Sequence, residues 1–292
     1  MKFSPRSIAR YPLLLRLLIF ISVLLSAWLP IIALCLWLLD DSNTLSIVVM
    51  SLLAFEFLAL VKLWGQVVYQ QPRIFQSYGL AITLKNGLDL IEGLATGLSS
   101  LWALFLFQGW LGWISWQDFP PRFPVVLLEG LLVALGVGLA EGLAFRGWLL
   151  DELQRDYSPK ISLWGSSVVY AGLHFLKPIA EVLRTLPQFP GLVLLGLALV
   201  WAKRSRSGRL GLSIGLHAGL VWGYYLIQVG ELVKYSNRVP EWVTGIDQNP
   251  LVGGMGLMFL GAIAFWMRCD RKRLFPSTLK DSGCSKFITN PG

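Results

Sequence analysis

The chain has 292 residues, of which 55% are hydrophobic and only 14% are charged, and its mean hydropathy is +0.61. A single soluble core cannot bury that much apolar surface, whereas a lipid bilayer can cover it. The net charge is +8. The basic residues cluster in every second loop between the apolar segments, and for this reason we expect no nucleic-acid partner. The three cysteines, Cys35, Cys269 and Cys284, form no framework for disulfides or for a cysteine-based zinc site.

The apolar segments predict an all-α polytopic membrane protein with about eight transmembrane helices. A helix needs about 20 apolar residues to cross the hydrocarbon of a bilayer. The first segment is longer than the apolar core of a signal peptide, so we expect it to be retained as an anchor. The fifth is the weakest, because only residues 161–176 of it are free of charge. The predicted spans are residues 17–39, 45–64, 90–113, 123–147, 161–180, 186–203, 209–229 and 249–267.

The distribution of lysine and arginine predicts the orientation. Loops on one side are poor in basic residues, and cytoplasmic loops of membrane proteins are rich in them. We therefore expect an integral, multi-pass protein with both termini in the cytoplasm. The tails and even-numbered loops carry Lys2, Arg6, Arg10, Arg16, Lys62, Arg73, Lys85, Arg155, Lys160, Lys203, Arg204, Arg206, Arg209, Arg268, Arg271, Lys272 and Arg273.

Four parts of the chain follow from these spans. Residues 1–122 are expected to hold the first three helices, with a connecting amphipathic helix near residues 73–88. Residues 123–229 are expected to form the core, helices four to seven. The last loop and the eighth helix occupy residues 230–275, and residues 276–292 are expected to be a flexible tail.

Four ionisable residues inside the apolar segments are the candidate functional residues: Glu141 and Arg146 on the fourth, His174 on the fifth and His217 on the seventh. Insertion of such a side chain into hydrocarbon costs about 2.5–3.5 kcal/mol, so these residues usually face a protein interior and have a function there. The fourth helix meets no breaker before Ser158, which predicts that it extends to about residue 155. Glu141 and the two histidines then lie at compatible depths, and we expect them to meet in one cavity that opens to the cytoplasm.

Each of these residues also has a purely structural interpretation. A single intramembrane histidine often serves only as a hydrogen-bonded packing residue. Glu141 could neutralise Arg146, although residues five apart lie about 140° apart around a regular α-helix, which is poor pairing geometry. The glycines spaced four apart on the fourth and seventh spans are assigned to helix packing. Helix ends or structural ion pairs are expected for Glu56, Asp89, Glu92 and Glu129.

Three short motifs in this region resemble those of the CPBP intramembrane proteases, the Abi-domain family of the type II CAAX prenyl endopeptidase and of bacteriocin-processing and immunity proteins. The family pattern has Glu-Glu-x-x-x-Arg on one transmembrane helix, Phe-x-x-x-His on the next helix and His-x-x-x-Asn on a later one. Residues 141–146 match the first motif with Gly142 at its second position, and residues 170–174 match the second with Tyr170 in place of Phe. His217 matches the third, with Val221 in place of Asn.

The resemblance implies an intramembrane endopeptidase that hydrolyses a peptide bond near the membrane surface. By family analogy Glu141 is the general base, His174 positions the water, and His217 donates to the oxyanion, with Arg146 and Tyr170 in support. The partners are then the bilayer and a membrane-associated peptide or protein. No cofactor is expected in this metal-free mechanism, and the variant with zinc would use Glu141, His174 and His217 as its ligands.

Two other classes of function compete with the enzyme. Val221 cannot donate a hydrogen bond and Gly142 removes a carboxylate, so the alternative is a catalytically inactive membrane scaffold or immunity protein of the same family. A proton-coupled transporter ranks third, because the two halves show no convincing repeat. Side chains that could replace the missing amide donor are Ser213, Trp222, Tyr224 and Tyr225.

Overall fold

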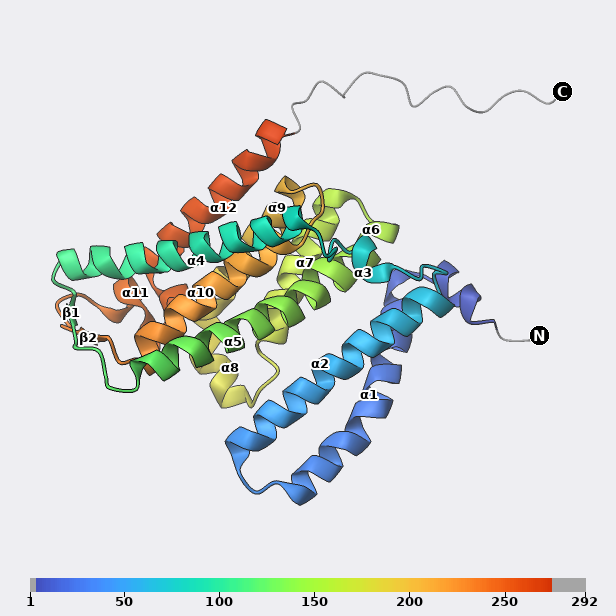
Figure 1. Ribbon diagram of the computed structural model, residues 1–292, viewed down its shortest axis with the longest axis horizontal. Coiled ribbons are helices and arrows are strands. Elements are labelled where there is room, and N and C mark those ends of the chain that lie inside the picture. The colour runs from blue at the N-terminus through green and yellow to red at the C-terminus, as the bar shows by residue number, and fades with distance from the viewer. Residues whose placement is uncertain (1–3, 275–292) are drawn as a thin grey trace.

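The computed structural model describes residues 4–274, whose regular secondary structure is helical apart from one short β-ribbon (Figure 1). The α-helices are α1 (Leu13–Leu38), α2 (Ser42–Val67), α3 (Ile74–Ser77), α4 (Leu84–Trp110), α5 (Phe123–Glu141), α6 (Leu150–Asp156), α7 (Pro159–Leu173), α8 (Ile179–Thr185), α9 (Phe189–Ser205), α10 (Gly211–Val229), α11 (Glu241–Thr244) and α12 (Gly254–Leu274). A π-helical segment, η2 (Gly142–Leu149), joins α5 to α6. Short 3₁₀ turns are η1 (Pro5–Arg10), η3 (Leu186–Gln188), η4 (Ile246–Gln248) and η5 (Pro250–Val252), and the antiparallel ribbon pairs β1 (Ile114–Trp116) with β2 (Val233–Tyr235).

Six helical stretches within residues 4–274 are long and apolar enough to cross a membrane, so the protein is a multi-pass membrane protein. The fourth stretch runs without a break to Asp156, as predicted. The predicted number of eight is not reached. The helix α7 has only 15 residues, and the apolar part of α12 ends at Arg268. The six stretches are Leu13–Leu38, Ile47–Val67, Leu84–Trp110, Phe123–Asp156, Ile179–Ser205 and Gly211–Val229.

One end of the helix bundle, called the basic end below, gathers the starts of α1, α4, α7 and α10 and the ends of α2, α6, α9 and α12 (Figure 1). Ion pairs tie these helix ends together. Arg206, just after α9, contacts Glu92 of α4 at 2.5 Å and Asp270 of α12 at 2.6 Å. Arg209 contacts Asp89 of α4 at 2.6 Å. The prediction of ion pairs for Asp89 and Glu92 is therefore confirmed. The β-ribbon lies at the opposite end of the bundle.

The helix α10 packs between α4 and α5, and its contact with α4 brings the two backbones together. An added Cβ atom on Gly215 would lie 2.0 Å from the carbonyl oxygen of Leu90, and one on Gly97 would lie 2.4 Å from that of Leu216. Only glycine allows so close an approach. The glycine stripes thus pack helix against helix, as predicted. Because His217 lies about 200° around the helix from this stripe, it turns toward α5.

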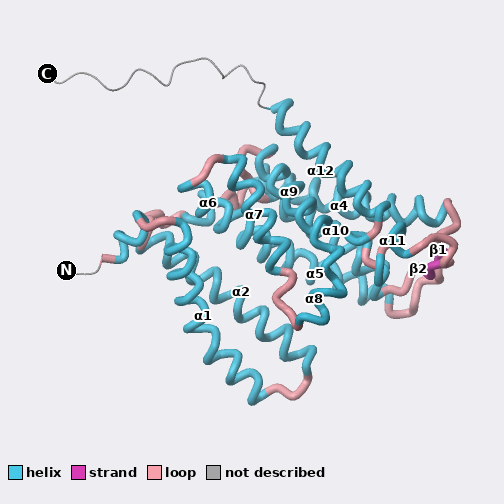
Figure 2. The backbone as a smooth tube through the Cα atoms, turned by 180° about the vertical axis from the view of Figure 1, so that it is seen from behind, coloured by secondary structure: helices cyan, strands magenta, loops and turns pink. Residues whose placement is uncertain are grey.

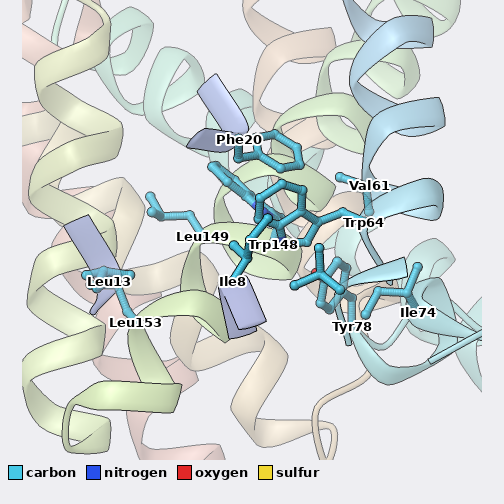
Figure 3. Packing of buried hydrophobic residues seen from close by; sticks show 11 residues of the cluster. Ile8, Leu13, Phe20, Val61, Trp64, Ile74, Tyr78, Trp148, Leu149 and Leu153 are labelled. Atoms are coloured by element: carbon cyan, nitrogen blue, oxygen red, sulfur yellow. The ribbon is translucent and has the colours of Figure 1, made fainter. Parts of the chain in front are cut away.

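A hairpin of α1 and α2 is attached to the core at the basic end and diverges from it farther out (Figures 1 and 2). Aromatic packing holds the attached part (Figure 3): the ring of Phe20 lies 5.3 Å from that of Trp64 and 4.3 Å from that of Trp148 of η2. Beside this cluster, Arg16 Nε lies 2.8 Å from Glu152 Oε2, and both side chains are buried. The hairpin is therefore an appendage held mainly at one end.

The connection between α2 and α4 differs from the prediction. A connecting amphipathic helix was expected near residues 73–88, but residues 73–83 form only the four-residue α3, and residues 84–88 already belong to α4. Gly79 ends it with a φ of 97°, a left-handed conformation that glycine adopts at no steric cost. The Gly79 carbonyl then accepts hydrogen bonds from Leu210 N at 3.0 Å and from Asn86 Nδ2 at 3.2 Å. Contacts of the Gly79 carbonyl therefore stand in place of the predicted helix after residue 79. The predicted tail at residues 276–292 lies outside the described residues.

Glu56 also differs from its expected place at a helix end or in an ion pair. It lies well inside α2. Neither of its carboxylate oxygens has a hydrogen-bond partner among residues 4–274.

Candidate active site in the helix core

A cavity of about 330 Å³ lies among α4, α5, α7, α9, α10 and α12. Most of its wall is aliphatic or aromatic, from residues such as Leu101, Leu195 and Ile263. A few polar groups converge on this apolar space, which is the usual composition of a ligand site. Those polar residues are Ser100, Glu141, Tyr170, His174, Gln188, His217, Tyr224 and Asn249.

Glu141 and His217 face each other across this cavity. Glu141 is the last residue of α5, and its Oε2 atom lies 3.8 Å from Nδ1 of His217 on α10. That distance is too long for a direct hydrogen bond. Neither of the two atoms has a hydrogen-bond partner within the described part of the chain. The Glu141 side chain is 28% exposed and that of His217 is 6% exposed. Both side chains therefore lie in the cavity wall, and their facing atoms are free of other hydrogen bonds among the described residues.

The π-helical segment η2 begins directly after Glu141 and changes its relation to Arg146. A π-helix closes with hydrogen bonds between residues five apart, so such residues lie nearly above one another. The expectation that the two side chains diverge by about 140° assumed a regular α-helix, and η2 departs from that geometry. A π-helical insertion at this place is typical of functional sites.

Arg146 is almost fully buried, with 1% of its surface exposed. Its guanidinium carbon lies 4.1 Å from the centre of the Tyr170 ring, a cation–π contact. The Nη atoms have no hydrogen-bond partner among residues 4–274. The backbone carbonyl of Arg146 accepts a 2.7 Å hydrogen bond from Lys203 Nζ of α9. Aromatic contact and burial between helices, rather than a close ion pair, therefore hold this arginine.

His174 stands at the C-terminal end of α7, where the helix stops after Leu173. Its Nδ1 atom lies 2.8 Å from the carbonyl oxygen of Tyr170. A carbonyl oxygen only accepts, so Nδ1 carries the hydrogen and Nε2 of the neutral ring is left as an acceptor. The predicted fifth span, residues 161–180, is thus cut short, and this places His174 at the edge of the cavity with an exposed side chain.

The structure also explains one departure from the family pattern. At Gly142 an added Cβ atom would lie 2.8 Å from Cγ1 of Ile214 on α10. There is no room for the glutamate that the pattern has at this position. Val221, the second departure, lines the cavity one helical turn after His217.

Of the four residues considered as substitute donors, only Tyr224 lines the cavity. Its hydroxyl accepts a 3.0 Å hydrogen bond from Gln228 Nε2. Trp222 Nε1 donates instead to the carbonyl of Leu127 at 3.0 Å. Ser213 is buried without a hydrogen-bond partner in the described region, and Tyr225 packs over Gly130.

Three polar cavity residues were missed by reasoning from the sequence: Ser100, Gln188 and Asn249. Ser100 lies within α4, and the other two lie in the short turns before α9 and α12, at the starts of the predicted sixth and eighth spans. The Oδ1 atom of Asn249 accepts a 3.0 Å hydrogen bond from Leu251 N, so the amide NH₂ is the end that remains able to donate. Asn-Pro at residues 249–250 marks a turn in the sequence, but nothing local indicates that the turn folds over the cavity.

The zinc alternative requires three ligands within reach of one ion. Among residues 4–274, no group of three His, Cys, Asp or Glu side chains is close enough to hold a metal ion. Glu141, His174 and His217 line the same cavity without forming such a group. As arranged, these residues do not fit the zinc alternative.

Comparison with known proteins gives the class of this domain. Residues 123–223 match the family model described as type II CAAX prenyl endopeptidase Rce1-like. This part of the chain is therefore an Rce1-like domain of the CAAX protease family, which confirms the resemblance read from the three motifs. The matched residues run from the start of α5 into α10 and include Glu141, His174 and His217. Comparison with curated proteins and with solved structures found no match.

Proposed function

We propose that the protein is an intramembrane endopeptidase that hydrolyses a peptide bond near the membrane surface. The observation that carries this proposal is the facing pair of Glu141 and His217 in an apolar cavity of the family domain, with the facing oxygen and nitrogen uncommitted. A carboxylate in a water-poor cavity is a suitable base for activating a single water. The substrate class is a membrane-associated peptide or protein.

The reaction follows from the roles assigned to the three residues. Glu141 accepts a proton from a water whose oxygen attacks the scissile carbonyl carbon, while Nε2 of His174 accepts a hydrogen bond from the other O–H of that water and so orients it. An imidazole N–H of His217 donates to the oxyanion that forms. When the C–N bond breaks, Glu141 passes its proton to the leaving amine. A preorganised donor is most effective where water is scarce.

The missing amide at Val221 favours the competing function, a catalytically inactive scaffold or immunity protein. Loss of one oxyanion donor typically lowers the rate about 10²–10³-fold in other hydrolases. The amide of Asn249 and the hydroxyl of Tyr224 line the same cavity and offer other donors. We favour the enzyme because the base and both histidines line one cavity, which a scaffold does not require.

The decisive experiment replaces Glu141 with Gln, which keeps the shape and removes the base. We expect cleavage of a library of membrane-associated peptides to fall at least about 10²-fold, while the folded yield stays normal. Glu129→Gln is the matched control, since Glu129 is exposed on the same helix and does not line the cavity. Normal cleavage by Glu141→Gln, or loss of its folded yield alone, would favour the scaffold.

A further inference from the structure

Near the end of the π-helical segment η2, two backbone carbonyls lose a donor that a regular helix would supply. In an α-helix the N–H of Leu150 would donate to the carbonyl of Arg146, four residues earlier, and in a π-helix to that of Phe145, five residues earlier. The N–H of Leu150 donates instead to the carbonyl of Gly147. The carbonyls of Phe145 and Arg146 are therefore open to donors from other helices.

Side chains from two other helices donate to these carbonyls. The hydroxyl of Ser166 on α7 donates to the carbonyl of Phe145 at 3.0 Å. The ammonium of Lys203, near the end of α9, donates to the carbonyl of Arg146 at 2.7 Å. A hydrogen bond from a charged donor is stronger than one between neutral groups. Two neighbouring peptide groups of η2 are thus held, one by α7 and the other by α9.

Both donors depart from the usual behaviour of their residue type. The buried Ser162 and Ser167 of α7 each donate to the carbonyl four residues earlier, at 3.0 and 2.9 Å. Ser166, which is 1% exposed, reaches across to η2 instead. A lysine near the end of a membrane helix usually extends its ammonium into water. Lys203 is half-buried, and its ammonium binds the backbone of η2.

The segment η2 joins two helices that are fixed separately. The helix α5 packs closely on α10 at Gly138, and α6 is fixed by the ion pair of Glu152 with Arg16. A regular α-helix over the same residues would change the rotation between α5 and α6 by about 100° for each residue of register. Glu141 is the last residue of α5 and borders η2 directly. Such a change would therefore turn its side chain relative to His217.

We propose that Lys203 and Ser166 are positioning residues of the candidate active site, which hold η2 in its π-helical form and so keep Glu141 facing His217. This inference rests on the proposed function. Neither Lys203 nor Ser166 lines the cavity, so both act through the backbone of η2 without touching substrate. Lys203 has the larger effect, because its hydrogen bond is charge-assisted.

The first test measures cleavage of membrane-associated peptides by the full chain. Lys203→Met keeps a long side chain and removes the donor. We expect kcat to fall by up to about 10²-fold, since misplacement of a catalytic group by about 1 Å can cost that much. KM should stay unchanged, because the cavity wall is unaltered. Lys203→Arg can still donate and should restore most of the rate, and Lys160→Met, at an exposed lysine of the same end, is the matched control.

Ser166→Ala should lower kcat in the same direction but by less. Its matched control is Ser162→Ala, which also removes a buried hydroxyl from α7, but one that donates to residues 157 and 158 beside it. An equal loss of kcat in Ser162→Ala would assign the effect to the packing of α7 and would overturn the role of Ser166. Elution in size-exclusion chromatography checks the folding of each variant. If Lys203→Met does not fold, Lys203→Arg and Ser166→Ala take its place in both tests.

The second test is independent of cleavage. Glu141→Cys is made in a chain whose three native cysteines are replaced by alanine, and its reaction with a water-soluble thiol reagent reports whether this position faces the cavity. Adding Lys203→Met should slow the reaction, because a thiol turned into apolar surroundings forms its thiolate less readily. Adding Lys160→Met should leave the rate unchanged.

The two tests separate failure of this inference from failure of the proposed function. An unchanged reaction rate with Lys203→Met would overturn the positioning role, whether or not the protein cleaves peptides. Loss of cleavage by Glu141→Gln together with a normal kcat for Lys203→Met would also overturn it and would leave the proposed function standing. Normal cleavage by Glu141→Gln together with a slowed thiol reaction would overturn the proposed function, and the hold of Lys203 on η2 would stand.

Discussion

Tyr170 is the residue on which the other side chains of the candidate site pack. Its ring lies 5.0 Å from that of Phe145, 4.7 Å from that of His174 and 6.4 Å from that of His217, measured between centres. The guanidinium of Arg146 covers it at 4.1 Å. Only 1% of the tyrosine is exposed. One buried aromatic ring thus fixes the positions of both histidines and of the arginine, and its own carbonyl sets the tautomer of His174.

At the same scale, Val221→Asn tests whether the missing amide limits activity. Val221 lines the cavity one turn after His217 and is half-buried, so an asparagine fits there without entering a packed core. We expect cleavage to rise by about 10-fold or more, toward the 10²–10³-fold that one oxyanion donor is worth. Val137→Asn, at another half-buried position in the cavity wall, is the control. A rise in both variants would show a general effect of polarity.

At the scale of elements, α10 is the central helix of the site. Glycines on one side bring its backbone against α4, and α5 approaches its other side at Gly138, where an added Cβ would lie 2.8 Å from the carbonyl of Ile214. These close approaches set His217 opposite the end of α5. The π-helical turn η2 then brings Arg146 under the site without ending the helix.

Gly215→Ala should therefore disrupt the fold. The added methyl group would lie 2.0 Å from the carbonyl oxygen of Leu90, and a backbone atom cannot yield as a flexible side chain does. We expect a loss of about 1–3 kcal/mol or more in stability, measured as a lower melting temperature in detergent. Gly136→Ala on α5 is the control, because an added Cβ there meets no atom within 4 Å. Helix propensity predicts that this second change stabilises the protein by up to about 1 kcal/mol. Equal melting temperatures for the two variants would contradict the packing argument.

At the scale of the whole molecule, the hairpin of α1 and α2 depends on a buried polar cluster. Glu152 of α6 accepts from Arg16 Nε at 2.8 Å and from the hydroxyl of Tyr69 at 2.5 Å. Burial and the neighbouring carboxylate raise the pKa of Tyr69 above its usual range, so the phenol keeps its proton and donates. The far part of the hairpin exposes Leu29, Trp37 and other large apolar residues, as expected for a surface covered by lipid.

Arg16→Ala should detach the hairpin from the core. The change leaves Glu152, which is 1% exposed, with an uncompensated buried charge. Breaking a buried pair in this way costs about 3–5 kcal/mol. Limited proteolysis in the loop between α1 and α2 should become faster, and the melting temperature should fall. The exposed Arg184 pairs with Glu181 on α8. Arg184→Ala should therefore leave the rate of proteolysis and the melting temperature unchanged. Unaltered proteolysis of Arg16→Ala would show that the aromatic cluster alone holds the hairpin.

The orientation of the whole molecule can also be tested. We propose that the basic end, and with it both termini, faces the cytoplasm, because basic residues prefer that side. A reporter fused behind Ala202, next to the loop at residues 203–209, should be active on the cytoplasmic side. A second reporter in the β-ribbon, at the opposite end of the bundle, should show the reverse. Activity of the first reporter on the outer side would contradict the orientation.

The sequence by itself determined the helical, membrane-spanning class and the family of the central domain. Hydropathy is a local property, since every backbone group of a membrane helix is satisfied within the helix, so six of the eight predicted spans appear in the structure. The motif residues Glu141, His174 and His217 were readable for a similar reason: ionisable residues in apolar segments stand out. The predicted fifth and eighth spans were the ones that fell short.

Only the tertiary structure decided the features that depend on neighbours distant in the chain. The fit of Gly142 against Ile214 and the position of Asn249 at the cavity wall follow from how helices far apart in sequence pack together. The π-helical segment that follows Glu141 has no periodic signal in the sequence, because a single added residue in one turn leaves the apolar pattern around it almost unchanged. Gly79 ends the connecting helix because its carbonyl finds partners from α4 and the start of α10. These features depend on contacts between residues far apart in the sequence, and such contacts form only when the helices pack together.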